Sequence, residues 1–490
     1  MSSEPKKVGR RKFIYAGLGA AIIVLGGATL YFATKPAETI TSVSTSTATT
    51  TVPTTITTTV QTTSVVTTTT SATSTTPPPV KIRVRGWLDW TKPGDRQTAW
   101  KYIMESYQSK YNNTISYEIM QWNTLDAKLL TDVQAGTAPD VSLVTMLSSA
   151  MHGMAESTYD LFEFYDKLPA EQRDFPDYVI GKARVFKNRL VQMPVDNHCV
   201  VIYYRRDVFS KLGLDPNIDE HPPDTLEKLI DLWYQIKDKS NGINPITGKE
   251  LYPFGQPLAS QPTQYFTSWI WYYGGDLYEN EKGKATYNSQ AGVKALEKYI
   301  QLRDDKIVPP DHVQATGTDA YNQFGDGRLA TVYTNSGHLP FIVERATPNL
   351  TDKEIGCFPF PKGAKPYSTP LLGWDVAMPK NISATTKLAA WNFIKHWSID
   401  EQEKFISYGG NLLPLRTSLI DAPFLKFHKF SYFIKKFVDV ALKLGRIPTH
   451  EHIWDLFDGL DKAIQSAVLH QKAPGDALDQ AANIFNAKYY

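Results

Sequence analysis

The chain has 490 residues, of which 42% are hydrophobic and 21% are charged, and its formal net charge is +2. A chain of this length can fold into two or three lobes that each bury a hydrophobic core. Its charges are mixed, with no clustered basic face, which excludes nucleic acid as an expected partner because phosphate binding requires such a face.

The N-terminus has the pattern of an exported, membrane-bound protein. Five basic residues lie within residues 1–12 and precede an uncharged run at residues 13–33. A run of this length spans a bilayer as a helix, and its basic flank stays in the cytoplasm. We therefore predict a single-pass cell-membrane anchor with the head outside the cell. A cleaved signal peptide and a processed prepilin-like leader are the alternatives.

Residues 34–80 are rich in Thr, Ser and Pro. Such a segment buries too little apolar surface to offset its chain entropy, so it is expected to form no core. Hydroxyl-rich tracts with Pro are typical of O-glycosylated stalks, and an unmodified linker is the alternative. Either form would separate the anchor from the globular part.

Cys199 and Cys357 are the two cysteines of the chain. Both lie in apolar strand-like segments, which favours buried free thiols over a disulfide. Sequons for N-glycosylation begin at Asn112, Asn349 and Asn381, and they matter only in a host that glycosylates exported proteins.

From residue 81 onward, strand patterns alternate with helix patterns. Strands are predicted at residues 81–86, 114–120, 140–145, 190–193, 199–204, 329–334 and 373–378. Helices are predicted at residues 95–111, 123–135, 207–212, 225–239, 264–273, 289–304, 385–397, 400–408, 430–444 and 461–490. The opening β-α-β-α-β order predicts an α/β fold, with a mostly parallel sheet covered by helices on both faces. Residues 194–198 are expected to bridge two strands at a hinge.

Six segments carry a resemblance to one family, in the order and spacing of that family. They are IRVRGWLDW at residues 82–90, LTDVQAGTAPDV at 130–141, MPVD at 193–196 with VIYYRRDVF at 201–209, FGDGRLA at 324–330, GWDVAMPK at 373–380 and GGNLLPLR at 409–416. The chain from residue 81 resembles the family 1 extracellular solute-binding proteins of ABC importers, which include maltose- and oligosaccharide-binding proteins. Arg205 stands where that family usually has Asn.

The resemblance implies a two-lobed, periplasmic-binding-protein-like fold of type II, with a hinge and a central cleft that closes on ligand. We expect lobe 1 to comprise residues 81–195 and 335–393, and lobe 2 residues 196–334 and 394–490. It also implies a sugar or oligosaccharide ligand and ABC permease subunits as partners. A peptide or polyamine ligand is the main alternative.

A sugar presents an apolar C–H face and a rim of hydroxyls, which suit aromatic rings and charged or amide groups respectively. Such groups belong on loops at strand ends that face the crevice. The candidate ligand-binding residues are Trp87, Asp89, Trp90, Trp122, Asn123, Thr145, Ser148, Asp196, Asn197, Asn335, Ser336, His338, Trp374, Asp375 and Asn411. Structural roles compete with several of them: Trp87 and Trp374 also suit a core, Asp89 a helix cap, and Asp196 a turn.

The sequence contains no motif of a nucleophile with its base, no Walker loop and no HExxH, so no enzyme activity and no cofactor are predicted. His450, Glu451 and His452 suit a solvated helix start better than a metal site. An anchored glycoside hydrolase and a cell-surface scaffold remain alternatives of another class.

Overall fold

A computed structural model describes residues 78–176, 178–280, 283–345, 350–351 and 353–490, and residues 79–490 form one compact unit. The predicted anchor at residues 13–33 and residues 34–77 of the predicted stalk lie outside the described residues. Among the residues that the structure describes, no helix is both long and apolar enough to cross a membrane.

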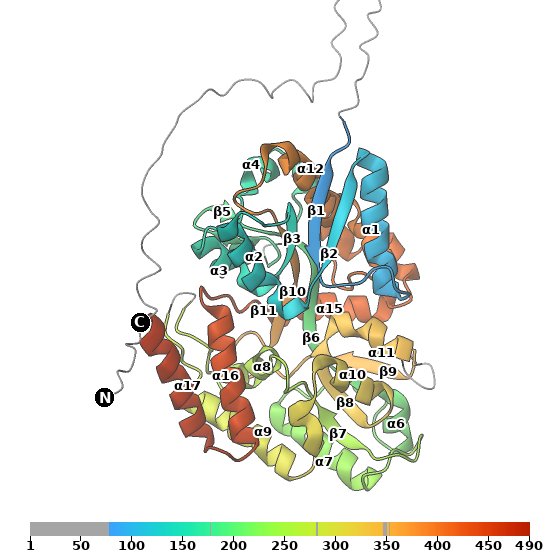
Figure 1. Cartoon of the computed structure of the whole chain (residues 1–490). Coiled ribbons are helices and arrows are strands. Elements are labelled where there is room, and N and C mark those ends of the chain that lie inside the picture. Colours follow the sequence, from blue (N-terminus) through green and yellow to red (C-terminus); the bar gives the residue numbers. More distant parts are fainter. Residues whose placement is uncertain (1–77, 177, 281–282, 346–349, 352) are drawn as a thin grey trace, which may run out of the picture. The chain divides into compact units, whose positions relative to one another are not determined.

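Within the described residues, nine strands form one mixed sheet, and two short strands form a separate hairpin (Figure 1). The sheet contains β1 (Lys81–Gly86), β2 (Thr114–Ile119), β3 (Val141–Thr145), β6 (Met193–Arg205), β7 (Tyr252–Gly255), β8 (Leu329–Asn335), β9 (Ile355–Phe358), β10 (Thr369–Ala377) and β11 (Gly445–Arg446), and the hairpin contains β4 (Val185–Phe186) and β5 (Arg189–Leu190). The strand order of the nine-stranded sheet is β2-β1-β3-β10-β6-β8-β7, with β9 paired to β6 and β11 to β10. β1 runs parallel to β2 and β3, whereas β10 runs antiparallel to β3 and β6.

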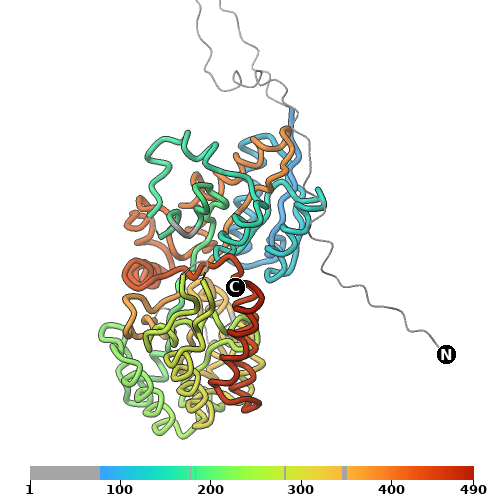
Figure 2. Tube along the Cα trace, turned by 90° about the vertical axis from the view of Figure 1, so that its left-hand side faces the viewer, coloured from blue at the N-terminus to red at the C-terminus, as the bar shows by residue number. Residues whose placement is uncertain are grey.

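The long strands β6 and β10 divide this sheet into two halves. The first residues of β6 pair with β10, and its last residues pair with β8 and β9. We call residues 79–192 and 378–408 lobe 1, and residues 206–358 and 447–490 lobe 2, with β6, β10 and the segment 409–446 at their junction. The views in Figures 1 and 2 show these two lobes one above the other.

Helices cover both halves of the sheet. Those of lobe 1 are α1 (Asp95–Tyr111), α2 (Leu125–Ala135), α3 (Ser149–Met154), α4 (Phe162–Tyr165), α5 (Gly181–Arg184), α12 (Ala384–Lys395) and α13 (Gln402–Ser407). Those of lobe 2 are α6 (Arg206–Lys211), α7 (Leu226–Ser240), α8 (Thr263–Tyr272), α9 (Gln290–Asp304), α10 (Gly317–Gly325), α11 (Leu339–Arg345), α16 (Ile453–Val468) and α17 (Pro474–Tyr489). α14 (Thr417–Ile420) and α15 (Ser431–Leu444) lie at the junction, where α15 packs on β6, β9 and β10.

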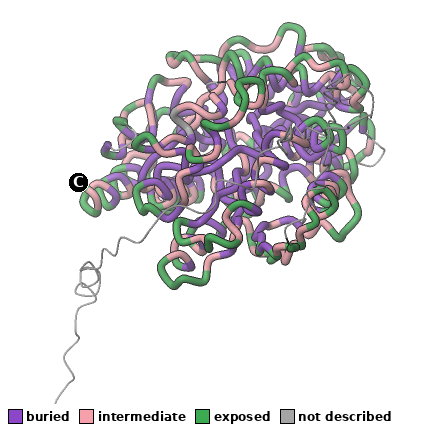
Figure 3. Tube along the Cα trace, turned by 90° about the horizontal axis from the view of Figure 1, so that it is seen from above, coloured by how far each residue is buried: buried purple, intermediate pink, exposed green. Residues whose placement is uncertain are grey.

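The apolar residues predicted to lie on one face of the first helix form part of the core of lobe 1. Trp100, Ile103, Met104 and Tyr107 of α1 are fully buried in one cluster with residues of β1, β3 and α12. A separate and larger cluster fills lobe 2 and includes α7, α8, α9, α16 and α17. Figure 3 shows the buried residues gathered inside and the exposed ones on the outer turns. Each lobe thus buries a core of its own.

The structure corrects four sequence-based predictions. The sheet is mixed rather than mostly parallel, since β8, β9 and β10 all run antiparallel to β6. Residues 194–198 do not bridge two strands, because β6 is continuous from Met193 to Arg205 and is buried throughout. The helix predicted at residues 461–490 is two helices: α16 already begins at Ile453, the left-handed backbone of His470 (φ 56°) lies in the break, and Pro474 opens α17. The segment from His450 to His452 is not a solvated helix start, since His450 is fully buried against the Gly283 carbonyl.

Cys199 lies in β6 and Cys357 in the neighbouring β9, and both are buried free thiols, which confirms that prediction. Among the described residues, no group of three or more His, Cys, Asp or Glu side chains could hold a metal ion. The lobe ranges predicted from the sequence remain a prediction. The pairing of β9 with β6 favours moving β9 to lobe 2, and the packing of α13 on α1 favours moving α13 to lobe 1.

His312 provides a test of the packing in lobe 2. It is 1% exposed and accepts the Gln256 backbone N–H at 2.5 Å, and burial lowers its pKa to about 3. An unfolded histidine has a pKa of about 6.5, so below that pH the unfolded chain takes up a proton that the native chain does not. We predict that His312 lowers the free energy of unfolding by about 2 kcal/mol when the pH falls from 7 to 5.

The measurement is urea unfolding at both pH values for the parent, for His312→Gln and for a control, His221→Gln, at an exposed position. The His312 variant should lose less stability on acidification than the parent, and the control should follow the parent. An equal loss in the His312 variant and the parent would contradict the prediction.

Candidate functional site

A cavity of about 910 Å³ opens between the two lobes. Because β1, β2 and β3 are parallel, their carboxyl ends meet at one edge of the sheet, as in other open α/β sheets. Trp87 and Trp122, which follow β1 and β2, and Thr145, the last residue of β3, line the cavity. The strand ends of lobe 1 thus form one wall of a cleft.

Three tryptophan rings form the apolar part of this wall. Trp87 and Trp374 lie with ring centroids 5.5 Å apart, and Trp122 meets Trp374 edge-on at 6.5 Å. All three are half-buried, so part of each ring faces the cavity. Flat apolar faces of this size suit the C–H face of a sugar ring.

A buried ion pair lies behind the tryptophans. The Arg96 guanidinium is 4% exposed, forms an ion pair with the fully buried Asp196, and lies over the Trp87 ring at 5.4 Å. His198 contacts the same carboxylate, with its Nε2 3.3 Å from Asp196 Oδ2. Gly337 of lobe 2 packs against the His198 ring so closely that a Cβ there would lie 2.3 Å from a ring atom. Two opposite charges therefore cancel within the wall.

Burial sets the protonation of the cleft's titratable groups. It lowers the pKa of Arg96 to about 10, so this guanidinium stays charged at neutral pH. Burial, together with the charge of Arg96, lowers the pKa of His198 well below its usual value. Burial lowers the pKa of His338 to about 3. Both histidines are neutral at pH 7 and can donate or accept hydrogen bonds without adding charge.

Lobe 2 supplies the opposite wall. Tyr265 of α8, Tyr321 of α10, Phe341 of α11 and Trp454 of α16 contribute rings, and Gln261 precedes α8. α10 begins with a capping box between Thr316 and Asp319, and this places its first turn at the cavity. Aromatic rings therefore face the cavity from both lobes.

Three hydrogen bonds between described residues join the lobes around the cavity. The Asp95 backbone N–H donates to Glu344 Oε1 at 3.0 Å, and Arg96 Nη1 donates to the Gly337 carbonyl at 3.2 Å. The third joins Trp454 Nε1 to Asp126 Oδ2 at 3.2 Å. The lobes are thus in direct polar contact across the cleft.

The structure brings seven of the fifteen candidate residues to the cavity: Trp87, Trp122, Asn123, Thr145, Asn335, His338 and Trp374. Ligand contact by these residues remains a prediction. The other eight, namely Asp89, Trp90, Ser148, Asp196, Asn197, Ser336, Asp375 and Asn411, are not among the residues that line it.

Most of those eight have evident structural partners. Asp89 accepts the Thr91 hydroxyl at 2.6 Å, and Trp90 packs on the ring of Tyr117. Arg184 binds both Asn197 Oδ1 and the Asp375 carboxylate, with 2.6 Å to Asp375 Oδ2.

Ser148 donates to Asp126 at 2.9 Å, and Ser336 accepts the Cys199 backbone N–H at 3.2 Å. Asn411 bonds the backbone of Leu413, two residues along the chain. Asp196 supports the wall through Arg96 from behind.

Sequence reasoning missed much of the lining, mainly residues of lobe 2. The missed residues are Arg96, Ile119, Met120, Gln121, Leu147, His198, Ser260, Gln261, Gln264, Tyr265, Thr316, Gly317, Thr318, Tyr321, Phe341, Leu372, Gly373 and Trp454. Thr316 with Asp319 is a capping-box pattern that could have placed a helix start there. The aromatic residues of α8 and α16 had no local signal, because their spacing also fits a helix core.

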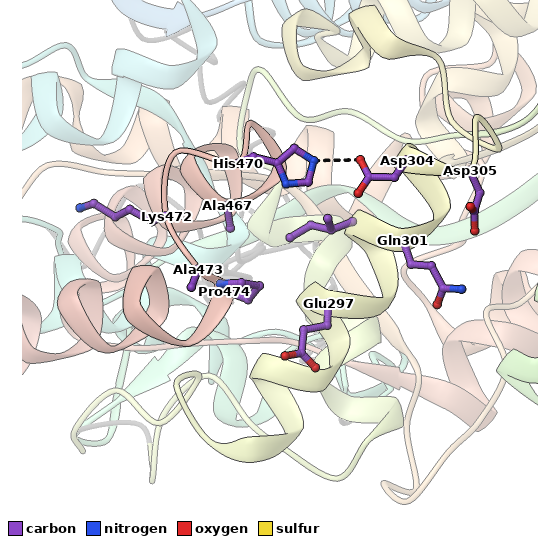
Figure 4. Close-up of a pocket in the computed structure, with 10 residues that line it drawn as sticks. Glu297, Gln301, Asp304, Asp305, Ala467, His470, Lys472, Ala473 and Pro474 are labelled. Carbon is purple, nitrogen blue, oxygen red and sulfur yellow. Dashed lines mark hydrogen bonds and ion pairs between the residues drawn. The ribbon is translucent and has the colours of Figure 1, made fainter.

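A second cavity of about 500 Å³ lies within lobe 2, between α9 and the connection from α16 to α17 (Figure 4). His470 and Asp304 meet there, with 2.9 Å between Nε2 and Oδ1, and Glu297 and Gln301 lie along α9. This cavity shares no residue with the cleft and has lining from lobe 2 alone.

The model of the family described as "Bacterial extracellular solute-binding protein" matches residues 102–429. The chain belongs to this family. The resemblance inferred from the six sequence segments is therefore confirmed, and the family description supports an extracellular location for the protein.

Among curated relatives, a binding protein of Brucella abortus (strain 2308) is 25% identical over 246 residues, which are 48% of this chain and 54% of the relative. The sn-glycerol-3-phosphate-binding periplasmic protein UgpB of Escherichia coli (strain K12) is 30% identical over 143 residues, 29% of each chain. The chain thus matches about half the length of the first relative and less of the second.

Solved structures share the fold over nearly all of their own length. Maltose-bound MalE3 of T. maritima aligns with a TM-score of 0.70 and 21% identity, over 84% of this chain and 100% of that one. UgpB of Mycobacterium tuberculosis in complex with glycerophosphocholine aligns with a TM-score of 0.69 and 17% identity, over 83% and 98%. These neighbours show a two-lobed, periplasmic-binding-protein-like α/β fold.

The ion pair behind the wall generates a second prediction. Arg96→Ala would leave the Asp196 carboxylate buried without its cation, which typically costs about 3–5 kcal/mol of unfolding free energy. Replacing both charges together, with Arg96→Met and Asp196→Leu, should cost much less, because no charge is left unpaired.

Urea unfolding at pH 7 measures these costs. Arg328→Ala is the control: it removes a guanidinium that pairs with Glu250 and Asp311 at a more exposed place, and it should cost under about 1 kcal/mol. A cost for Arg96→Ala no larger than for this control would contradict the prediction.

Proposed function

We propose that the protein is the substrate-binding component of an ABC importer and that it captures a sugar or short oligosaccharide in the cleft. The observation that carries this proposal is a cavity of about 910 Å³ with aromatic rings on both lobes and neutral polar groups between them. Rings hold the apolar face of a sugar, and the amide and hydroxyl groups bind its rim.

The charge of the cleft narrows the ligand class. Among the described residues that line it, none is Asp or Glu, and Arg96 is the one formally charged side chain. A polyamine requires carboxylates to balance its ammonium groups, so this lining disfavours one. Glycoside hydrolysis requires a pair of carboxyl groups at the bond, so the lining also favours binding without turnover. A peptide ligand remains the main alternative.

A phosphate ester of a polyol is a second candidate. Arg96 lies in the wall, and guanidinium groups bind phosphate well. The relatives named above include proteins that bind sn-glycerol-3-phosphate and glycerophosphocholine, as well as maltose. Asp196 already balances Arg96, and for this reason we rank the neutral sugar first.

Release of ligand would follow from a hinge at the junction of the lobes. β6 and β10 pass through both lobes, so rotation there would open the cleft. Ligand would favour the closed arrangement by contacting both walls at once. The closed protein would then deliver the ligand to a membrane permease.

We further propose that residues 13–33 tether the protein to the cell membrane, with a glycosylated stalk at residues 34–80 and the lobes outside the cell. In fractionated cells, the full chain should remain with the membrane after a high-salt wash, and a chain that lacks residues 1–35 should not. If cells that express the full chain yield a soluble protein with a new N-terminus by mass spectrometry, the leader is cleaved instead.

A thermal-shift screen of the full chain tests the ligand class. A ligand that binds only the folded state adds about 2.7 kcal/mol of stability at a hundredfold excess over its Kd, and it raises the Tm. We expect shifts with mono- or oligosaccharides, and none with polyamines. A shift with peptides alone would overturn the sugar assignment, and hydrolysis of an oligosaccharide in the sample would overturn the assignment as a binding protein.

Two tryptophan variants locate the binding. Trp374→Ala removes a ring that lines the cleft, and we expect it to weaken sugar binding about tenfold or more, about 1.4 kcal/mol. Trp90→Ala is the matched control, because this half-buried ring packs against the same hydrophobic cluster as Trp374 but does not line the cleft. Equal losses in the two variants, measured by isothermal titration calorimetry, would show that the cleft is not the binding site.

A further inference from the structure

The carboxylate of Asp126, at the start of α2, accepts more hydrogen bonds than a residue in a turn or helix cap usually does. Asp126 is 5% exposed, and its carboxylate accepts five hydrogen bonds. Oδ1 accepts the Thr145 backbone N–H at 3.0 Å, the Ser148 hydroxyl at 2.9 Å and His152 Nε2 at 3.2 Å. Oδ2 accepts the Thr145 hydroxyl at 2.7 Å and the Trp454 indole N–H at 3.2 Å.

Four of these five donors belong to lobe 1, and Trp454 is the one from lobe 2. The lobe 1 donors fix the place and the tilt of the carboxylate, because an ionised carboxylate offers about four lone-pair directions and several of them are taken. His152 is itself fixed, since its Nδ1 lies 2.9 Å from the Ser157 hydroxyl and its side chain is fully buried. Lobe 1 therefore presents one rigid acceptor to the Trp454 indole.

Trp454 lines the cleft and is half-buried, so its ring lies between this acceptor and the ligand space. An indole N–H only donates, and a bond to a charged acceptor is stronger than one to a neutral acceptor. The direction of that bond sets how the ring face turns toward the cavity. Leu147, next to Ser148 in the chain, packs into the hydrophobic cluster of lobe 2 and holds the two lobes together at the same place.

We propose that Asp126 is a positioning residue for Trp454: it orients the indole of lobe 2 from lobe 1, so that the ring is placed for ligand only when the lobes meet. This inference rests on the proposed function, since it assigns the cleft to a ligand that stacks on rings. Binding and closure are then coupled through one hydrogen bond, because opening the lobes removes the acceptor that orients the ring.

The chain offers a matched pair of rings for a test. Trp454 and Trp87 both line the cleft, but the Trp87 indole nitrogen has no hydrogen-bond partner among the described residues. Trp→Phe keeps an aromatic face and removes the indole N–H at either position. For the saccharide with the largest thermal shift, we expect Trp454→Phe to raise Kd about tenfold or more and Trp87→Phe to raise it about threefold or less.

Asp126→Asn supplies the second side of a double-mutant cycle. The amide brings a donor group into a site where the Thr145 and Trp454 N–H groups both require an acceptor, so either orientation of the amide leaves one of them unsatisfied. Introduced into the parent, Asp126→Asn should raise Kd. Introduced into Trp454→Phe, it should raise Kd by a factor that is at least about threefold smaller. Equal losses in the two Trp→Phe variants, or independent effects in the cycle, would overturn the inference.

A measurement without ligand separates this inference from the proposed function. In the NMR spectrum of the full chain, the Trp454 indole proton is the signal that Trp454→Phe removes. Its exchange with solvent should be slow in the parent and should quicken in Asp126→Asn, and this result would support the bond even if no saccharide bound. Fast exchange in the parent, or unchanged exchange in Asp126→Asn, would overturn the inference whatever the ligand screen shows.

Discussion

The pairing of β6 with β10 is the constraint on which the rest of the structure depends. These strands run antiparallel through the middle of the sheet, join β3 on one side and β8 on the other, and belong to both lobes. β6 has no exposed residue along its length, so it can serve two hydrophobic cores at once. The cleft lies between the two halves of the sheet that this strand pair joins, beside the carboxyl ends of β1, β2 and β3.

The chemistry of the crevice follows from what each lobe can deliver there. Parallel strands of lobe 1 end together and bring Trp87, Trp122 and Thr145 to one wall. Lobe 2 delivers helix ends and rings instead. The one charged side chain of the lining, Arg96, is balanced by Asp196 immediately behind it, which suits a ligand without net charge.

Much of lobe 1 could be predicted from sequence, because its signals are local. The alternation in residues 81–86 and the apolar spacing of α1 gave elements with the bounds that the structure shows. The sequence predicts a bridge at residues 194–198 because Pro194 and three polar residues resemble a turn, whereas tertiary pairing with β10 keeps them in a strand. The missed residues of the cleft, such as Trp454 and Tyr265, come from helices whose positions depend on contacts distant in sequence. Asp89 and Asp375 had suitable types and places, but local turns and Arg184 hold them.

Gly337 has a consequence for how such proteins could diverge. Gly337 contacts the His198 ring, and its carbonyl accepts a hydrogen bond from the Arg96 guanidinium. The size of this residue therefore limits how closely two parts of the cleft wall can approach. A hydrogen atom is the smallest spacer that a protein can place there. A single methyl group at this residue would overlap the His198 ring, so the ring or the backbone of residue 337 would have to move away. Because His198 lines the cleft, one codon outside the lining could change the shape of the ligand space.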